Sequence, residues 1–410
     1  MNMSRTIDPQ LRSNLLVLFA AGLLFWSSLA SLLPTLPLYI ESVGATKQQI
    51  GIVMGGFAIG LLLFRPWLGR LADRRGRKIV LLIGTLVAAI APLGYLFVKP
   101  IPLLIVLRAF HGISIAAFTT GFNALVADIA PLEKRGEIIG YMSLVNPIGI
   151  AIGPALGGYL QAGVGNEILF LTSAELAFVG FLGILPIFNP TVVTKQQEDT
   201  VNSQFWRILI SPRVKTPATI MLLVGLAFGA LHTFIPLFIK SIGIQLNPGL
   251  FYTTAAISSF GVRLFTGKAS DRLGRGLFVT LSLVFYTLSM SVLWLANSPT
   301  AFLFAAIIEG AGSGTLIPMI AAMMVDRAHA YERGQIFAIC LMGLDVGIAI
   351  AGPALGSIAE YIDYRNMFGL CACLTFLSIF IFLTQSSKDL LSSLRFALGR
   401  GQDAYALKDT

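Results

Sequence analysis

The stretch GRLADRRGRK, residues 69–78, joins two long apolar runs, and a related stretch, GKASDRLGRG, stands at 267–276, a spacing of 198 residues. Residues of the same type recur at this spacing well beyond the two stretches. The matched pairs are Arg65 with Arg263, Gly69 with Gly267, Asp73 with Asp271, Gly76 with Gly274, Arg77 with Arg275 and Asp128 with Asp326. Agreement over dozens of residues indicates that the chain contains a duplicated structural unit.

The composition excludes an ordinary soluble globule. Hydrophobic residues make up 56% of the 410 residues and charged residues only 12%, with a mean hydropathy of +0.81. Soluble domains carry about 25% charged residues. Apolar runs of about 20 residues recur along the chain, which is the length that spans a bilayer as a helix. These runs lack the period-two alternation of a membrane barrel, so the sequence predicts an all-α membrane protein.

The apolar runs predict twelve transmembrane helices in two six-helix bundles. The spans of the first half are 13–40, 48–68, 79–98, 101–126, 137–161 and 166–188, and those of the second half are 216–241, 248–266, 277–296, 300–325, 335–360 and 364–384. The predicted domains are an N-terminal bundle at 1–188, a polar cytoplasmic linker at 189–215, a C-terminal bundle at 216–384 and a cytoplasmic tail at 385–410. The duplication predicts that the bundles are related by an axis along the membrane normal.

The basic residues predict the topology. Most Lys and Arg residues lie in the N-terminal segment, the linker, the tail and alternate loops, whereas the other loops hold only Lys47, Lys99, Lys240 and Arg365. The positive-inside rule therefore places both termini in the cytoplasm, as expected for a multi-pass protein of a bacterial inner membrane. The first apolar run continues for more than 25 residues, which is too long for a cleaved signal peptide.

Several function classes are disfavoured by the sequence. The cysteines, Cys340, Cys371 and Cys373, all fall within apolar runs, so neither a disulfide framework nor a metal site is expected. The net charge of +9 is spread over alternate loops and does not form one basic face for nucleic acid. Neither a phosphate-binding loop nor a catalytic triad or zinc spacing is recognisable. The sequence therefore predicts no enzyme activity and no cofactor.

The 69–78 stretch resembles the signature loop between the second and third helices of the major facilitator superfamily, and the chain resembles its 12-helix drug/proton antiporter group. The resemblance implies a conformational latch in which Asp73 sits near the start of the eleventh helix and Arg77 pairs with an acid such as Asp128. The full predicted latch set is Gly69, Asp73, Gly76, Arg77, Asp128, Asp271, Arg275 and Asp326. The alternative is that these basic residues only anchor the topology.

A second motif lies in the fifth predicted helix. Its residues Gly149, Gly153, Pro154, Gly157 and Gly158 resemble the family's antiporter pattern G-x-x-x-G-P-x-x-G-G. Small residues four apart let a neighbouring helix approach closely, and proline removes a backbone hydrogen bond, so the motif predicts a helix that can bend and slide. Static close packing is the alternative, and a near copy at 347–356 weakens the link to antiport.

Ionisable residues at membrane depth are the candidate proton-coupling groups. Arg108 and His111 lie in Arg108-Ala109-Phe110-His111-Gly112, which is similar to the family's R-x-x-Q-G pattern but has histidine in place of glutamine. Placing an arginine at this depth costs roughly 2.5–3.5 kcal/mol, so a wet cavity or a partner acid is expected. At the 198-residue spacing His111 matches Glu309, which allows the two to face each other across a central cavity as a titrating pair.

Further candidates line the helices expected to surround that cavity. Asp345 and His232 are ionisable, and Glu175 is too, although in this fold its helix is expected at the periphery. The other cavity candidates are Phe25, Trp26, Phe118, Phe122, Asn123, Asn146, Phe228, Phe234, Met319 and Met323. Each could equally be lipid-facing or packed in the core. An apolar, aromatic and methionine-containing cavity suits small amphipathic compounds more than sugars.

The sequence therefore predicts proton-coupled efflux of a small amphipathic compound or drug by alternating access, driven by the proton gradient. One alternative is symport or facilitated transport of a specific nutrient or metabolite. An alternative of another class is a membrane sensor or scaffold that transports nothing. The expected partners are the small-molecule substrate, protons and the lipid bilayer, and the protein is expected to be a monomer.

Overall fold

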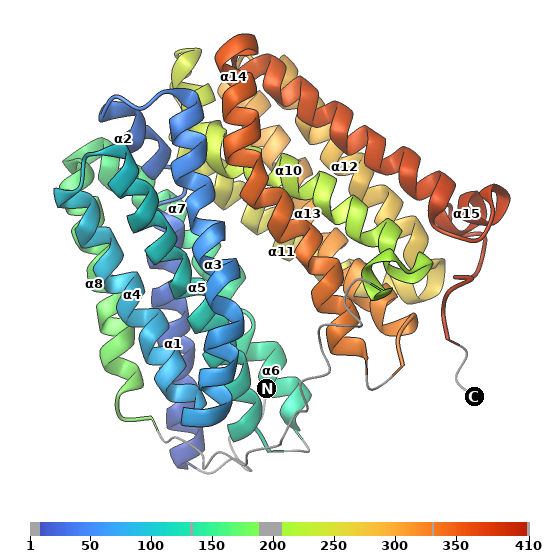
Figure 1. Ribbon diagram of the computed structural model, residues 1–410, viewed down its shortest axis with the longest axis horizontal. Coiled ribbons are helices and arrows are strands. Elements are labelled where there is room, and N and C mark those ends of the chain that lie inside the picture. The colour runs from blue at the N-terminus through green and yellow to red at the C-terminus, as the bar shows by residue number, and fades with distance from the viewer. Residues whose placement is uncertain (1–8, 132–133, 188–206, 330–331, 408–410) are drawn as a thin grey trace. The chain divides into compact units, whose positions relative to one another are not determined.

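Apolar runs without period-two alternation form helices in the computed structural model, which describes residues 9–131, 134–187, 207–329 and 332–407 (Figure 1). Every regular element in those ranges is helical. The helices of the first half are α1 (Pro9–Ser31), α2 (Leu36–Ser42), α3 (Lys47–Arg75), α4 (Arg77–Phe97), α5 (Ile101–Ile129), α6 (Arg135–Met142), α7 (Val145–Val164) and α8 (Asn166–Ile184). Those of the second half are α10 (Pro212–Ser241), α11 (Pro248–Leu273), α12 (Arg275–Leu295), α13 (Pro299–Asp326), α14 (Arg333–Gln385) and α15 (Leu390–Ala397). The all-α fold class is confirmed.

Ten helical stretches in the described residues are long and apolar enough to cross a membrane. The last of them, Ile336–Gln385, is 50 residues long, whereas one crossing takes about 20 residues. Within it, Asp363 has φ 59° and ψ 170°, so α14 consists of two helices that meet at a kink. The kink falls in the predicted gap between the last two spans. If α14 crosses twice and α11 once, the count reaches twelve, which stays a prediction.

Two predicted helices are each interrupted in the structure, at points where proline explains the break. Residues 32–35 form turns between α1 and α2, and residues 143–144 form a turn between α6 and α7. A proline ring clashes with the carbonyl four residues earlier and removes one backbone donor. Pro34 and Pro37 act in this way at the first break, and Pro147, four residues after Ser143, acts at the second.

The described residues divide into two compact units. Those within Met1–Ala45, Gly56–Gln196 and Asn247–Thr253 form the first unit, and those within Thr46–Gly55, Gln197–Leu246 and Thr254–Thr410 form the second. The start of α3 is thus grouped with the second unit and the rest of α3 with the first. The start of α11 is grouped with the first unit and the rest of α11 with the second. The predicted linker at 189–215 lies mostly outside the described residues, and α10 begins within it at Pro212. The predicted domain boundaries stay predictions.

In the first unit, α1 packs against α7 and α8, while α4 packs against α5 and α8 (Figure 1). Its core is rich in aromatic rings. The ring of Phe25 stacks on that of Phe118 with centroids 3.8 Å apart, and Phe122 stacks on Phe118 at 5.1 Å. All three side chains are buried. Their burial anchors α1 to α5.

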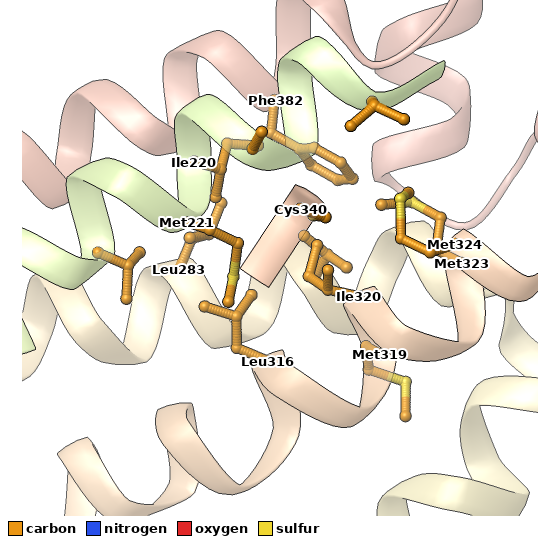
Figure 2. Close-up of a cluster of buried hydrophobic side chains, with 14 of the residues drawn as sticks. Ile220, Met221, Leu283, Leu316, Met319, Ile320, Met323, Met324, Cys340 and Phe382 are labelled. Atoms are coloured by element: carbon orange, nitrogen blue, oxygen red, sulfur yellow. The ribbon is translucent and has the colours of Figure 1, made fainter. Parts of the chain in front are cut away.

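In the second unit, α10 packs along α14, and α12 contacts both α13 and α14. Figure 2 shows the core between these helices, where aliphatic and sulfur-containing side chains interdigitate. Met323 and Met324 are fully buried there, and Met319 is 4% exposed. Methionine fills irregular gaps because its side chain is unbranched and flexible. These methionines are therefore core residues in this structure.

The tail after α14 folds back onto the second unit. Its helix α15 contacts α12 and α14 (Figure 1), and Asp389 caps its start by accepting a hydrogen bond of 2.9 Å from the Ser392 backbone N–H. Further along, Asp403 forms an ion pair of 2.7 Å with Arg327, whose side chain is fully buried. The 385–410 segment, predicted only as a tail, thus contains a helix and a buried ion pair.

Candidate functional site

The predicted latch residues of the first unit come together around Arg77, the first residue of α4. Its guanidinium forms an ion pair with the Asp73 carboxylate near the end of α3. On its other side, Arg77 Nε lies 3.4 Å from Asp128 Oδ2 near the end of α5. Gly76 has φ 102°, a conformation that glycine adopts without strain, and it turns the chain from α3 into α4.

The second unit repeats this arrangement. Arg275 begins α12, and its guanidinium lies 2.6 Å from Asp326 Oδ2 at the end of α13. Gly274 before it has φ 91°, as Gly76 does in the first unit. The side chain of Asp271 lies outside the described residues. The duplication inferred from the sequence therefore extends to the ion pairs that hold the ends of these helices.

Gly69, a member of the predicted latch set, stands near the end of α3. A Cβ added at Gly69 would meet no atom of the described residues within 4 Å, and the same holds at its counterpart, Gly267. Neither glycine therefore faces a neighbouring backbone within the part of the chain that the structure describes.

The glycines of the predicted antiporter-like motif lie on one face of α7, against α1. A Cβ at Gly149 would overlap Trp26, one at Gly153 would crowd the Ser27 carbonyl, and one at Gly157 would overlap the Ser31 carbonyl. Three glycines at spacings of four thus let two backbones touch. Pro154 lies within the helix, and the fourth glycine, Gly158, faces Asn247.

Replacing Gly157 by alanine is expected to lower the free energy of unfolding by about 1–3 kcal/mol, because the new methyl group would overlap backbone atoms of α1. Gly163 provides a matched control on the same helix, since a Cβ there meets no described neighbour within 4 Å. Gly163→Ala should be neutral or stabilising by up to about 1 kcal/mol through helix propensity. Thermal unfolding of the two purified variants in one detergent checks this; shifts of the same sign and size would contradict close packing at Gly157.

Arg108 and His111 form a buried polar cluster with residues of neighbouring helices. The Arg108 guanidinium lies over the Phe57 ring, 4.3 Å from its centroid, and its Nη1 is 3.4 Å from His111 Nδ1. The Tyr95 hydroxyl is 3.2 Å from the same His111 nitrogen. Both Arg108 Nε and His111 Nε2 are buried without a hydrogen-bond partner among the described residues. The cluster thus carries a charge and retains two unused polar atoms.

Glu309, the counterpart of His111, lies in a second buried cluster in the second unit. Its side chain is 4% exposed, and its Oε1 has no hydrogen-bond partner among the described residues. Ser313 and Tyr286 lie beside the Glu309 carboxyl, and the Ser313 hydroxyl donates to the Gly310 carbonyl at 3.3 Å. Arg263 of α11 is close enough for its charge to act on Tyr286. The cluster can therefore hold a carboxyl group whose second oxygen remains available.

The other predicted ionisable residues occupy more open positions. Asp345 and His232 are half-buried, and the His232 ring is 4.3 Å from that of Phe228. Glu175 is exposed on α8. Asp345 and His232 are thus partly buried and still have side-chain surface that a ligand can reach, whereas Glu175 lies on the surface of the first unit.

The predicted cavity residues divide into two groups. Those buried in the core are Phe25, Phe118, Phe122, Phe234, Met319 and Met323. Those with exposed surface are the half-buried Trp26, Asn146 and Phe228 and the exposed Asn123. Only the second group offers surface to a ligand in this conformation.

Sequence reasoning did not identify Tyr95 and Tyr286, although each borders a candidate proton-coupling residue. Both tyrosines are buried. A buried tyrosine usually places its hydroxyl against a polar partner, so tyrosines within apolar runs were the available signal. Their spacing in the sequence gives no indication of which helix they approach.

Comparison with known proteins identifies the family. The family model of the Major Facilitator Superfamily matches residues 18–278 and 249–397. The chain is 27% identical over 401 residues to the staphylopine export protein of Staphylococcus aureus, covering 92% of this chain and 97% of that protein. It is 27% identical over 382 residues to a multi-drug resistance efflux pump PmrA homolog of Lactococcus lactis, covering 88% and 92%. The multidrug resistance protein MdtG of a Rahnella species is 25% identical over 374 residues, covering 88% and 90%.

Solved structures share the fold. The nucleoside transporter NupG superposes with a TM-score of 0.80 at 16% identity, covering 90% of this chain and 99% of that one. A bacterial homolog of the human lysosomal transporter Spinster superposes with a TM-score of 0.73 at 13% identity, covering 98% and 100%. Since the family model matches most of the chain and the relatives align over nearly their whole lengths, the chain belongs to the Major Facilitator Superfamily and is a multi-pass transporter of the bacterial inner membrane.

Proposed function

We propose that this transporter exports small amphipathic compounds in exchange for protons. The observation that carries the proposal is the likeness, over nearly the full length of both chains, to proteins named for export and multidrug efflux. A likeness that covers 92% of this chain and 97% of the first relative includes the elements that would bind a substrate as well as those that form the fold.

Proton exchange needs a group that binds and releases a proton as the transporter changes conformation. Glu309 and Asp345 are the proposed carriers, because a carboxylate at membrane depth must either bind a proton or find a partner. The unused Oε1 of Glu309 supports its assignment. In the first unit, the Arg108 and His111 cluster supplies a fixed positive charge near the matching position of the repeat.

The proton gradient is sufficient to drive such export. One elementary charge crossing 100 mV is worth about 2.3 kcal/mol, which holds roughly a fifty-fold concentration ratio of an uncharged solute for each proton exchanged. Export by this route requires no nucleotide.

The proposed substrate class follows from the partly exposed candidates. Trp26, Phe228 and His232 combine an aromatic ring with accessible surface, and Asn146 adds an amide. Aromatic rings accompanied by few polar groups suit compounds that are largely apolar and carry one or two polar groups. Sugars, which need dense hydrogen bonding, fit this set less well.

The test uses proteoliposomes that contain the purified transporter and an imposed pH gradient, screened with pooled dyes, drugs and metabolites. Uphill movement of an amphipathic compound against the direction of proton flow is expected, and collapse of the gradient with an ionophore should abolish it. Movement in the same direction as protons would replace antiport by symport. Transport of none of the compounds, with or without a gradient, would contradict the proposal.

Asp73→Asn is expected to reduce the transport rate several-fold, because it removes one of the two carboxylates that hold Arg77. The Asp73 side chain is well exposed, so the protein's stability should change by less than about 1 kcal/mol. Glu137→Gln provides a control that neutralises another exposed acid of the same unit. Initial transport rates at equal amounts of reconstituted protein check this. An unchanged rate for Asp73→Asn would contradict the assignment of Asp73 to a conformational latch.

A further inference from the structure

A cavity of about 370 Å³ lies where the start of α10, the end of α14 and the folded tail meet. Its size is within the range of small-molecule sites, about 300–1,000 Å³. The side chains that matter for its chemistry are Lys215, Thr384, Ser387, Lys388, Asp389 and Tyr405. All belong to the second unit, and the topology predicted from the basic residues places this end of the helices at the cytoplasmic face.

The charged side chains of the cavity favour an anion. Lys215 and Lys388 are exposed, and neither forms an ion pair within the described part of the chain. The one carboxylate, Asp389, is engaged by the start of α15, since it accepts hydrogen bonds from the Ser392 backbone N–H at 2.9 Å and from its hydroxyl at 2.7 Å. These hydrogen bonds lower the pKa of Asp389. Two lysines therefore remain available for a ligand.

Ser387 adds a buried polar atom. The side chain of Ser387 is 7% exposed, and its hydroxyl has no hydrogen-bond partner among the described residues. A buried hydroxyl without a partner costs free energy. An oxygen-rich ligand in the cavity would satisfy it, and phosphate oxygens accept hydrogen bonds from both hydroxyl and ammonium groups.

The surface next to the cavity is apolar and continues along a membrane helix. Thr384 lines the cavity, and Phe380 and Phe376 precede it by one and two helical turns on the same face of α14. Phe380 is 59% exposed and Phe376 62% exposed. On the other side, Leu390 of α15 is also exposed. A ligand with a charged end in the cavity and hydrocarbon chains along these side chains fits both surfaces.

We propose that this cavity binds the headgroup of an anionic phospholipid, with Lys215 and Lys388 contacting the phosphate, Ser387 donating a hydrogen bond to it, and the acyl chains lying along Phe380 and Phe376. Basic pockets at the cytoplasmic ends of membrane helices bind acidic headgroups through these interactions. The bound lipid would join α10, α14 and the tail, which are the three segments that form the cavity.

Native mass spectrometry of the full-length protein in detergent tests the proposal by titration with dioleoyl phosphatidylglycerol or dioleoyl phosphatidylcholine. Phosphatidylglycerol should bind at least tenfold more tightly. Lys215→Gln/Lys388→Gln should weaken its binding about twenty-five-fold, at roughly fivefold for each lysine. The control Lys99→Gln/Arg400→Gln removes two exposed charges outside the cavity and should change binding less than twofold, while Lys215→Arg/Lys388→Arg should retain it.

Three outcomes would overturn the proposal: equal binding of the two lipids, equal weakening in the control pair, or displacement of phosphatidylglycerol by millimolar inorganic phosphate. The last would identify a free anion as the ligand. If the double glutamine variant does not fold, as judged by thermal unfolding, the single variants replace it. If both single variants bind phosphatidylglycerol as tightly as the wild type does, the site is also rejected.

Discussion

Asp403→Ala is expected to lower the free energy of unfolding by about 3–5 kcal/mol, the range found when one partner of a buried ion pair is removed. The Arg327 side chain is 0% exposed and that of Asp403 only 10%. Arg327 Nη1 also donates to the Arg213 carbonyl at 2.9 Å, and Nη2 donates to the Ser386 carbonyl at 3.2 Å. Carbonyls solvate the guanidinium but do not neutralise it, so removing the carboxylate leaves an uncompensated buried charge.

The loss should be concentrated in the tail. Asp403 holds the segment that follows α15, and the Leu407 backbone N–H donates to the Asp326 carbonyl at 2.8 Å. Limited proteolysis of Asp403→Ala should therefore cleave after α15 earlier than in the wild type, and thermal unfolding in detergent should begin at a lower temperature. Both measurements use the full-length protein.

Two further variants distinguish the buried charge from general damage to the tail. Asp389→Ala removes an exposed helix cap. It should lower the unfolding temperature much less than Asp403→Ala does. Arg327→Met/Asp403→Leu removes both charges and should recover most of the stability lost in Asp403→Ala, because apolar replacements of buried ion pairs are often neutral. Equal destabilisation by Asp403→Ala and Asp389→Ala, or no recovery in the double variant, would contradict the assignment.

The parts of the fold that could be predicted were those encoded locally or repeated. Apolar runs gave the helices, since a bilayer leaves few alternatives to a helix of that length. The resemblance to the family's loop implied that Arg77 pairs with Asp128, and the 198-residue repeat matches these two residues to Arg275 and Asp326. The structure shows both ion pairs. Prolines stand at the breaks in the first and fifth predicted helices, but a proline alone does not predict a break, because membrane helices often accommodate it.

The environment of the candidate site could not be predicted, because a helix that is apolar all round does not reveal which face meets which neighbour. Phe25 and Phe122 were candidate cavity residues and lie in the core of the first unit. Tyr95 and Tyr286 approach His111 and Glu309 from other helices. The tail shows the same difficulty, since the contact of Asp403 with Arg327, 76 residues away in the sequence, follows only from the packed fold.

Glu309→Gln is expected to abolish pH-driven accumulation while preserving substrate binding. Glutamine has nearly the shape of the glutamate side chain but cannot gain or lose a proton, so the variant could exchange substrate down its gradient without coupling. The roughly fifty-fold ratio that one proton supports at 100 mV should then fall toward one. Because Glu309 is buried beside Ser313 and Tyr286, a neutral amide of equal size should fit without loss of folding.

Counterflow and pH-driven uptake into inverted proteoliposomes separate the two properties. In Glu309→Gln, exchange of labelled for unlabelled substrate at equal pH should continue at a rate similar to that of the wild type, whereas uptake driven by a pH gradient should be lost. Glu309→Asp keeps a titratable carboxyl and should retain part of the coupling. Glu167→Gln neutralises an exposed acid of α8 and should behave as the wild type. Full pH-driven accumulation by Glu309→Gln would assign the coupling proton elsewhere, with Asp345 as the next residue to test by substitution with asparagine.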